Sequence, residues 1–508
     1  MDSSNQKLYL VGYAGELSIK GKRVRNLFTH RLAENLANAL DSHQIPHEIE
    51  PTWSRLFVRS PSADVVEVAQ RVFGVQWVSS VEERTWSTLD DLLQQGEEIF
   101  APLLAGKTFA VRARRGPAAQ KIPFRSPELE RKLGSRLDPL AAGVDLRSPQ
   151  VTARVELKGP RAFFFSESQP GPGGLPLGTE GRALALVSGG FDSLVAAWQL
   201  LRRGVCLDYM FCNLGGDTHR DRVLEVLKVL SDRWSYGYRP KIHMVDFRPV
   251  VEELQAVCPQ SLWQVILKRQ MLRAADHLAR MTRAIALITG EAVGQVSSQT
   301  LHNLAIISQA TQHTILRPLV GANKDDIVSQ ARRIGTYELS SKVPEYCALA
   351  PKNPESHAKP EPVLAAEEGL DPELLRALVY ERAIVDLRAL DLGKMRAPDL
   401  EVTEVPSEAV VVDLRSSMAF KAWHYPEAVH LGYREALELY PSFDRKKLYL
   451  FYCEVGLKSA HLAELVHRAG GRSCHFKGGL KPLKRLSQED DLLRHLDSPV
   501  LLEPRDGS

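Results

Sequence analysis

Residues 184–193 read Leu-Ala-Leu-Val-Ser-Gly-Gly-Phe-Asp-Ser, and this stretch decides both the fold and the chemistry expected of the chain. Its apolar start is typical of a buried strand, and residues 194–201 continue with helical spacing. A strand, a glycine-rich turn and a helix N-terminus bring free backbone N–H groups and the positive end of the helix dipole to one point. We therefore predict an anion site, where Ser188 and Ser193 add hydroxyl donors and Asp192 holds a magnesium ion that bridges phosphate oxygens.

The loop differs from a Walker A motif. The one Gly-Lys-Thr string, at residues 106–108, has Ala101 where the first glycine should stand. The SGGFDS string, in which Gly189 and Gly190 let the backbone approach a phosphate, resembles the PP-loop of the N-type ATP pyrophosphatases. That resemblance implies attack at the α-phosphorus of ATP, with pyrophosphate as the leaving group. The product would be an adenylated substrate and not a phosphorylated one.

Bulk properties predict a multidomain cytoplasmic protein. The chain has 508 residues, 44% apolar and 25% charged, which suggests about three domains. Its first residues carry no basic segment followed by an apolar one, and no apolar run approaches about 18 residues, so we expect no membrane partner. Six cysteines without a Cys-x-x-Cys spacing argue against a disulfide framework and a zinc ribbon.

Positive charge is concentrated in residues 101–165, which hold 13 Lys and Arg against 5 Asp and Glu. Residues 108–115 alternate apolar and basic side chains at the period of a strand. Together with the turn at residues 73–75, this segment resembles the THUMP domain of tRNA-modifying enzymes. The resemblance implies phosphate contacts to tRNA from one basic face. The residues expected on this face are Arg112, Arg114, Arg115, Lys121, Arg125, Arg131 and Lys132.

The order of expected elements predicts an α/β multidomain protein. Strands and helices alternate through residues 177–350, which predicts a doubly wound parallel sheet with its ligand at the carboxyl ends of the strands. A helical connector is expected at residues 364–390. The predicted organisation is a ferredoxin-like domain (1–60), a THUMP domain (61–168), a PP-loop ATP pyrophosphatase domain (177–350), a linker with a connecting helix (351–403), a rhodanese-like α/β domain (404–482) and an extension of unknown role (483–508).

Further strings extend the PP-loop resemblance to a whole family. The strand at residues 284–288 leads into Thr-Gly-Glu-Ala-Val-Gly-Gln-Val-Ser-Ser-Gln-Thr (289–300), and Lys268 lies on a predicted helix from which it could reach phosphate as a point charge. With SGGFDS, NLGG, ILKR, LRPL and PEYC, the chain resembles the bacterial tRNA 4-thiouridine synthetases, sulfurtransferases that act on uridine 8 of tRNA, over roughly residues 1–482. The ATP contacts implied by this resemblance are Leu186, Val187, Ser188, Gly189, Gly190, Asp192, Ser193, Lys268, Gly290 and Gln299.

Two cysteines are candidates for sulfur chemistry. Cys453 follows an apolar strand and begins the loop into a predicted helix, where backbone N–H groups and the helix N-terminus stabilise a thiolate. The surrounding strings resemble a rhodanese domain, which implies that Cys453 carries a persulfide. Glu454 departs from the arginine common at that position and disfavours a thiolate, and Lys458 could compensate. Cys347 lies in a loop after the last predicted helix of the sheet domain, and the resemblance implies that it forms a disulfide with Cys453.

These parts combine into one hypothesis with two rivals. The resemblance implies that tRNA is adenylated with ATP and Mg²⁺ and then thiolated by a persulfide from a cysteine desulfurase. It also implies a second role in supplying sulfur for the thiazole of thiamine, with a thiamine sulfur-carrier protein as partner. The sequence leaves the oligomeric state open, a homodimer included. The rivals are an adenylating ligase of a small molecule and an RNA-binding sulfur carrier without catalysis.

Overall fold

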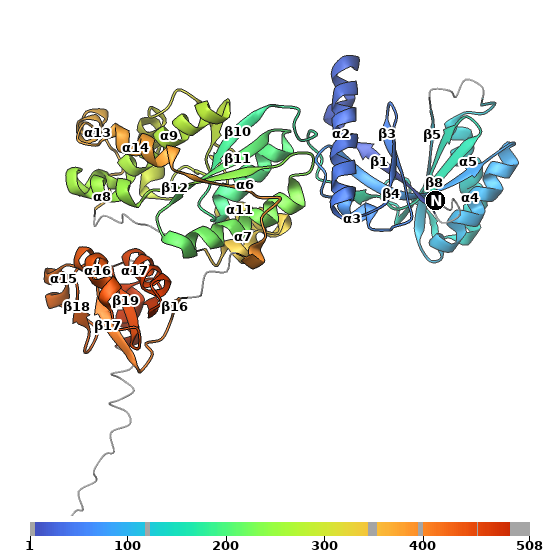
Figure 1. Cartoon of the computed structure of the whole chain (residues 1–508). Helices are drawn as coiled ribbons and strands as arrows, with labels where there is room; N and C mark the ends of the chain where they lie inside the picture. The colour runs from blue at the N-terminus through green and yellow to red at the C-terminus, as the bar shows by residue number, and fades with distance from the viewer. Residues whose placement is uncertain (1–5, 117–121, 344–352, 395–399, 455, 488–508) are drawn as a thin grey trace, which may run out of the picture. The chain divides into compact units, whose positions relative to one another are not determined.

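The computed structural model describes residues 6–116, 122–343, 353–394, 400–454 and 456–487. The chain divides into two compact units (Figure 1). Unit 1 comprises residues 1–181, 198–206 and 232–239, and unit 2 comprises residues 182–197, 207–231 and 240–508. Among the described helices, none combines the length and the apolar character that crossing a membrane requires.

Unit 1 is built on one nine-stranded sheet. Its strand order is β2-β3-β1-β4-β8-β7-β5-β6, and β9 also pairs with β4. The strands are β1 (Lys7–Tyr13), β2 (Glu48–Pro51), β3 (Arg55–Ser60), β4 (Val75–Thr85), β5 (Thr108–Arg115), β6 (Gly143–Val144), β7 (Val151–Lys158), β8 (Arg161–Phe165) and β9 (Gln169–Pro170). The helices are α1 (Gly15–Ser18), α2 (Lys22–Ser42), α3 (Val65–Ala69), α4 (Leu89–Leu104) and α5 (Ser126–Leu137).

Two separate cores pack helices against this sheet. One core joins α2 and α3 to β1, β3 and β4, where Leu32 and Leu36 are fully buried. The other joins α4 and α5 to β5, β7 and β8, around Phe100 and Phe109. The two cores confirm the ferredoxin-like and THUMP-like halves expected from the order of elements. Strand β8 was not predicted, although Phe163 to Phe165 form an apolar run that suits a buried strand.

Unit 2 contains a six-stranded sheet of order β14-β13-β10-β11-β12-β15. The pairs β10–β13, β11–β12 and β13–β14 are parallel, as predicted. The strands are β10 (Arg182–Leu186), β11 (Cys206–Asn213), β12 (Lys241–Asp246), β13 (Ala286–Ile288), β14 (Thr314–Leu316) and β15 (Ala383–Asp386). The helices are α6 (Phe191–Arg202), α7 (Gly216–Trp234), α8 (Arg248–Val257), α9 (Trp263–Thr282), α10 (Leu301–Ser308), α11 (Lys324–Ile334), α12 (Tyr337–Ser340), α13 (Pro360–Glu367) and α14 (Pro372–Tyr380).

The expected helical connector at residues 364–390 is wrong in its second half. Helices α13 and α14 end by Tyr380, and β15 then pairs antiparallel with the edge strand β12. Lys241 lies opposite Asp386, and Met244 lies opposite Ala383. The β-branched pair at residues 384–385 suits a strand, and pairing satisfies backbone groups that the edge of β12 would otherwise leave open.

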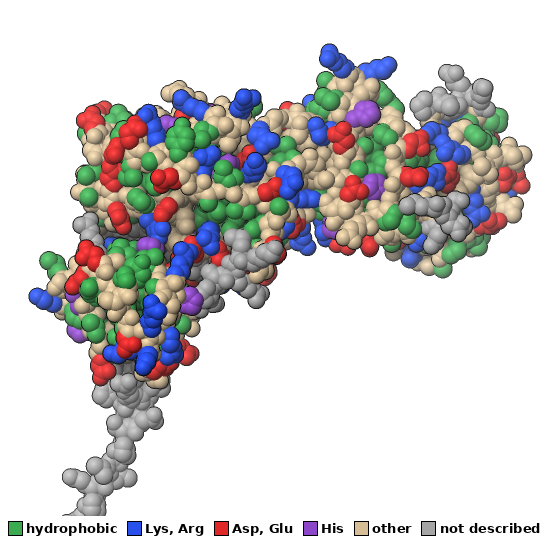
Figure 2. Space-filling model, in the orientation of Figure 1, with side chains coloured by type: hydrophobic (Ala, Val, Ile, Leu, Met, Phe, Trp, Pro, Cys, Tyr) green, Lys and Arg blue, Asp and Glu red, His purple; other side chains and the backbone are tan. Residues whose placement is uncertain are grey.

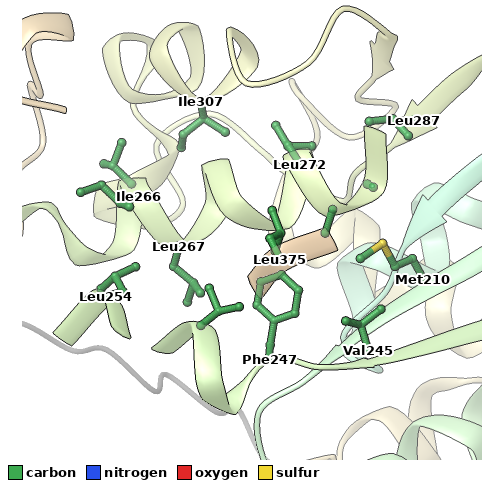
Figure 3. Packing of buried hydrophobic residues seen from close by; sticks show 14 of the residues in the cluster. Met210, Val245, Phe247, Leu254, Ile266, Leu267, Leu272, Leu287, Ile307 and Leu375 are labelled. Atoms are coloured by element: carbon green, nitrogen blue, oxygen red, sulfur yellow. The ribbon is translucent and has the colours of Figure 1, made fainter. Parts of the chain in front are cut away.

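A large apolar core covers one face of this sheet. Residues of α8, α9, α10, α13 and α14 pack there against strand residues, among which are Met210, Val245 and Leu287 (Figure 3). Helices α7 and α11 lie on the other side of the sheet (Figure 1). Coverage of both faces explains why residues 183–185 of β10 and 207–211 of β11 are buried without alternation. The doubly wound prediction is confirmed.

The last part of unit 2 is a smaller parallel sheet of order β16-β20-β19-β17-β18. Its strands are β16 (Glu401–Val402), β17 (Ala409–Asp413), β18 (Val429–His430), β19 (Leu448–Tyr452) and β20 (Arg472–Phe476). Its helices are α15 (Ser417–Ala422), α16 (Tyr433–Leu439) and α17 (Leu457–Arg468). The pairs β17–β18, β17–β19, β19–β20 and β16–β20 are all parallel, which places the loop after β19 at a carboxyl edge.

Candidate active site

The glycine-rich loop, defined as residues 187–190, joins β10 to α6 at the carboxyl edge of the six-stranded sheet. Val187 N–H donates to the Met210 carbonyl at 2.9 Å, which keeps the start of the loop beside β11. Gly189 has φ +82°, a conformation that favours glycine. The Ser193 hydroxyl donates to the Gly190 carbonyl at 3.2 Å, which closes the turn onto the first turn of α6.

Gly290 lies against the start of α6. A Cβ on Gly290 would come within 2.6 Å of the Asp192 carbonyl carbon and the Ser193 nitrogen, both of them backbone atoms. Backbone cannot yield as a flexible side chain can, so the absence of a side chain lets the loop after β13 meet the helix N-terminus. Two stretches that the sequence singled out separately are thereby brought together.

A cavity of about 430 Å³ opens at this junction. Its walls come from the glycine-rich loop, the N-terminus of α6, β11, α7, α9, the loop after β13 and the N-terminus of α11. Of the ten residues expected to contact ATP, nine line it, and Gly189 does not. These nine are Leu186, Val187, Ser188, Gly190, Asp192, Ser193, Lys268, Gly290 and Gln299. The size falls in the range of small-molecule sites, roughly 300–1,000 Å³.

Asp192 is held in this cavity by two groups that sequence reasoning did not assign. Lys324 Nζ lies 2.9 Å from Asp192 Oδ1 and 3.0 Å from Oδ2, and Gln295 Nε2 donates to Oδ2 at 2.9 Å. Lys324 is the first residue of α11, where a positive charge opposes the helix dipole. That unfavourable position was a signal in the sequence that this lysine faces negative charge from another element.

Lys268 takes part in a buried ion cluster. Its Nζ lies 3.1 Å from Glu291 Oε1, and Arg317 Nε donates to Glu291 Oε2 at 2.9 Å. Burial alone would raise the pKa of the Glu291 carboxyl, but the charges of Lys268 and Arg317 outweigh burial and hold the pKa below its ordinary value. Glu291 therefore stays ionised and orients Lys268, which lines the cavity.

Magnesium fits this site through one carboxylate. Among the described residues there is no cluster of three or more His, Cys, Asp or Glu suited to hold a metal ion. Magnesium in nucleotide sites is commonly held by one or two carboxylates together with phosphate oxygens and water. Asp192, which faces the cavity beside the glycine-rich loop, is the carboxylate that meets this requirement.

Cys453 follows β19 and is buried, with 3% of its surface exposed. Its Sγ lies 3.6 Å from the Ser459 hydroxyl, in the first turn of α17. Leu480 N–H donates to the Cys453 carbonyl at 2.9 Å, which ties this loop to the segment after β20. The thiol thus lies between a strand end and a helix N-terminus, as predicted.

The negative charge of Glu454, next to Cys453, is not compensated by Lys458 as expected. Arg415 Nη1 lies 3.9 Å from a Glu454 carboxylate oxygen, and Arg415 also forms a buried ion pair with Asp413 at 2.6 Å. Lys458 instead lies over the Tyr433 ring, 5.3 Å from its centroid. The cation facing Glu454 is therefore Arg415, which sequence reasoning missed.

The basic strand β5 does not present all its arginines on one face. Arg112 and Arg114 are exposed and alternate with Val111 and Ala113, which belong to the core beneath α4 and α5. Arg115 lies on that core side, where its Nη1 donates to the Phe124 carbonyl at 2.6 Å. The expected single face that includes Arg115 is wrong, because the period of a strand sends neighbouring residues to opposite sides. Lys121 lies outside the described residues.

A second cavity, of about 310 Å³, lies in unit 1 beside this strand. Four arginines and one glutamate line it: Arg25, Arg55, Arg114, Arg154 and Glu156. Arg154 lies directly opposite Arg112 in the β5–β7 register. Burial, and then the charge of Arg112, lower the pKa of Arg154 from its ordinary value. On the face drawn in Figure 2, basic and acidic side chains are interspersed. The lining of this cavity differs, because its charged side chains are four arginines and one glutamate.

Comparison with known proteins agrees with this architecture. Family models for the ThiI ferredoxin-like domain, the THUMP domain, the thiamine biosynthesis protein ThiI and the rhodanese-like domain match residues 8–79, 87–167, 178–371 and 401–485. A tRNA sulfurtransferase of Pyrobaculum aerophilum is 41% identical over 403 residues, covering 79% of this chain and 82% of the relative. The chain belongs to the ThiI family of tRNA sulfurtransferases.

Further members and a solved structure extend the match. A tRNA sulfurtransferase of Pseudomonas aeruginosa is 38% identical over 462 residues, covering 87% of this chain and 94% of the relative. A solved 4-thiouridine synthetase, in complex with RNA and with bound ATP, is 29% identical with a TM-score of 0.65. That match covers 75% of this chain and 99% of the solved one.

Proposed function

We propose that this chain is an ATP-dependent tRNA sulfurtransferase that converts uridine 8 of tRNA to 4-thiouridine. The observation that carries the proposal is the cavity in which the glycine-rich loop, Lys268 and Lys324 converge on the N-terminus of α6. The relatives named tRNA sulfurtransferase and the ATP-bound 4-thiouridine synthetase support the choice of reaction. The arginine cavity of unit 1 and the cysteine loop supply the other two requirements, RNA binding and sulfur carriage.

ATP occupies the cavity with its phosphates on the glycine-rich loop. Ser188, Gly189, Gly190 and Ser193 offer backbone and hydroxyl donors to the leaving pyrophosphate. Leu186, Val187, Gly290 and Gln299 border the remaining space, which receives the nucleoside. Lys268 and Lys324 add two positive charges within the same cavity.

Adenylation proceeds by attack of the uracil O4 on the α-phosphorus. The O4–phosphorus bond forms, N3 releases its proton to solvent, and the bond to pyrophosphate breaks with the electron pair on the leaving group. Charge builds on the phosphoryl oxygens in the transition state, where Lys268 and Lys324 stabilise it most. Asp192 would hold Mg²⁺, which when bound neutralises the charge of the leaving pyrophosphate.

The arginine cavity of unit 1 provides the contacts to tRNA. Arg112 and Arg154 face each other across β5 and β7, a pairing of like charges that costs free energy until an anion lies between them. The Arg114 side chain extends the same face into the cavity, and Arg125 is exposed at the start of α5. Such phosphate contacts position RNA without reading its sequence.

Sulfur transfer uses Cys453 and Cys347. A cysteine desulfurase loads Cys453 as a persulfide, whose terminal sulfur attacks C4 of the adenylated uridine and expels AMP. The Cys347 thiolate then attacks the Cys453 sulfur, which breaks the sulfur–sulfur bond, releases 4-thiouridine and leaves a Cys347–Cys453 disulfide. A thiol reductant supplies two electrons to reopen that disulfide.

The flanks of the Cys347 segment support its part in this step. Cys347 itself lies outside the described residues, four positions after Val343, which lines the ATP cavity. Four residues of chain span at most about 14 Å. On the other side, Thr300 donates to the Ser356 carbonyl at 2.7 Å and Asn303 donates to the Glu355 carbonyl at 2.8 Å. The flank before Cys347 thus lines the cavity, and the flank after it is held by the end of the loop after β13 and the start of α10.

The test is mass analysis of tRNA incubated with the purified full-length protein, ATP, magnesium, cysteine, a cysteine desulfurase and a thiol reductant. We expect an oxygen-to-sulfur mass shift in one uridine, located at position 8 by fragment mapping. Cys453→Ser is expected to form AMP in a tRNA-dependent reaction but no thiouridine. Thiolation by Cys453→Ser would remove the persulfide role, and absence of tRNA-dependent AMP formation by the wild type would overturn the proposal.

A further inference from the structure

His219 is a buried histidine in the wall of the ATP cavity to which the mechanism above gives no part. It lies in the first turns of α7, is 4% exposed and lines the cavity together with Ser188 of the glycine-rich loop. Its ring meets the Phe211 ring edge to face, with centroids 4.7 Å apart and planes at 89°. The imidazole hydrogen-bonds to the backbone of Ser188. Its ring is therefore fixed on one side by β11 and on the other by the loop.

The next turn of α7 reinforces the same contact. Val223 follows His219 by four residues, so both side chains lie on one face of the helix. A Cβ on Gly189 would lie 2.9 Å from Val223 Cγ2, which shows how closely this face approaches the loop. Helix α7 therefore supports the peptide between Ser188 and Gly189 at two successive turns.

We propose that His219 is a positioning residue for phosphate binding, which holds the Ser188 carbonyl and so sets the direction of the Ser188–Gly189 peptide. In a trans peptide the carbonyl and the N–H point in opposite directions. An imidazole N–H bound to the Ser188 carbonyl therefore directs the Gly189 N–H away from α7. The inference rests on the proposed function in that the ligand of the loop is the triphosphate of ATP.

The loop needs such a contact because glycine permits the opposite peptide. Gly189 has φ +82°, and glycine occupies positive and negative φ about equally. Rotating the Ser188–Gly189 peptide would exchange an N–H donor for a carbonyl oxygen, which repels phosphate. A glycine-rich loop binds anions when its N–H groups point the same way, so one reversed peptide removes a donor and adds a negative partial charge.

Histidine is suited to this position because it donates a hydrogen bond without carrying charge. Burial lowers the pKa of His219 to about 4, while the bond to the Ser188 backbone acts in the opposite direction. The ring is thus neutral near pH 7. A neutral donor orients the peptide, while Lys268 and Lys324 neutralise the negative charge of the phosphates.

The test compares His219→Phe, which keeps a ring without a donor, with His219→Asn and His219→Gln, which place an amide donor near one or the other ring nitrogen. Binding of ATP, pyrophosphate and adenosine to the full-length protein is measured by calorimetry. A ligand that binds weakly is measured by how far it shifts the titration with ATP. We expect the phenylalanine variant to weaken ATP and pyrophosphate about tenfold. Adenosine binding stays unchanged, and one of the two amide variants restores most of the phosphate affinity.

His243→Phe is the matched control. His243 is 3% exposed, lies on β12 away from the cavity wall, and has its pKa lowered to about 4, first by burial. We expect this control to lower thermal stability without changing the affinity for ATP or pyrophosphate.

Two results would overturn the inference: unchanged ATP affinity in His219→Phe, or equal loss of ATP and adenosine affinity, which signals general damage to the cavity. Failure of both amide variants to restore phosphate binding is a third result that would overturn it. If the wild type binds ATP in this donor-dependent way but does not thiolate tRNA, the proposed function fails while the role of His219 stands.

Discussion

Lys324 Nζ and Asp192 Oδ1 lie 2.9 Å apart in the wall of the ATP cavity, although 132 residues separate them along the chain. The ion pair joins the N-terminus of α11 to the N-terminus of α6, so two helices present their positive ends to the same space. Because the two side chains are 49% and 25% exposed, the pair contributes little to stability, roughly 0–1 kcal/mol. Its importance is that it places the positive charge of Lys324 in the cavity.

Lys324→Met removes the charge and keeps the length of the side chain. We expect tRNA-dependent AMP formation to fall at least about 100-fold, because a cation aimed at the transition-state phosphoryl oxygens is lost. The thermal unfolding midpoint should change little. Lys359→Met, an exposed lysine at the start of α13, is the control and should keep its rate. An unchanged rate in Lys324→Met would exclude Lys324 from adenylation.

Gly290→Ala tests the contact between the loop after β13 and the start of α6. The new Cβ would meet backbone atoms of Asp192 and Ser193 at 2.6 Å, so either the loop or the helix must move. We expect the Kd for ATP to rise about tenfold or more, because anion binding depends on the position of the helix N-terminus. Gly321→Ala, where a Cβ meets nothing within 4 Å, is the matched control. Equal ATP affinity of both variants would contradict this prediction.

Glu291→Gln tests the buried ion cluster. The change leaves Lys268 and Arg317 without their shared carboxylate, and loss of one partner of a buried pair costs about 3 kcal/mol. The folded pKa of Glu291 lies below its ordinary value, so its stabilisation is fully present above that value and is lost as pH falls through the folded pKa. Urea unfolding of wild type and variant at pH 7 and near pH 3 measures this. We expect a large difference at pH 7 and a smaller one in acid; a difference independent of pH would refute the assignment.

Arg154→Ala and Arg114→Ala test the arginine cavity as the tRNA contact. Each variant should weaken tRNA binding several-fold and reduce by about 1 the slope of log affinity against log salt concentration. ATP affinity should not change, since the ATP cavity is built from other residues. Arg147→Ala, an exposed arginine after β6, is the control. If Arg154→Ala and Arg114→Ala keep the wild-type salt slope, as the control does, phosphate does not bind in this cavity.

Local sequence determined much of this protein. The buried strand, SGGFDS and the helix after it form one continuous segment, so their geometry follows from short-range rules of strand, turn and helix. The same holds for Cys453 between β19 and α17, and for the alternation of strands and helices that predicted a doubly wound sheet. Nine of the ten residues expected at ATP also meet in one cavity.

Only the tertiary structure decided which distant groups complete the sites. Lys324 and His219 reach the cavity from separate elements, and Arg317 pairs with Glu291, which holds Lys268. Arg415, not Lys458, faces Glu454. Residues 383–386 were expected to be helical but form strand β15. Their pairing partner, β12, lies far away along the chain, so the local sequence does not reveal the pairing. Side-chain partners depend on the packing of elements remote in sequence, which periodicity and motif spacing do not encode. The sequence by itself determined the chemistry of the loop, and packing decided which charges and hydrogen bonds surround it.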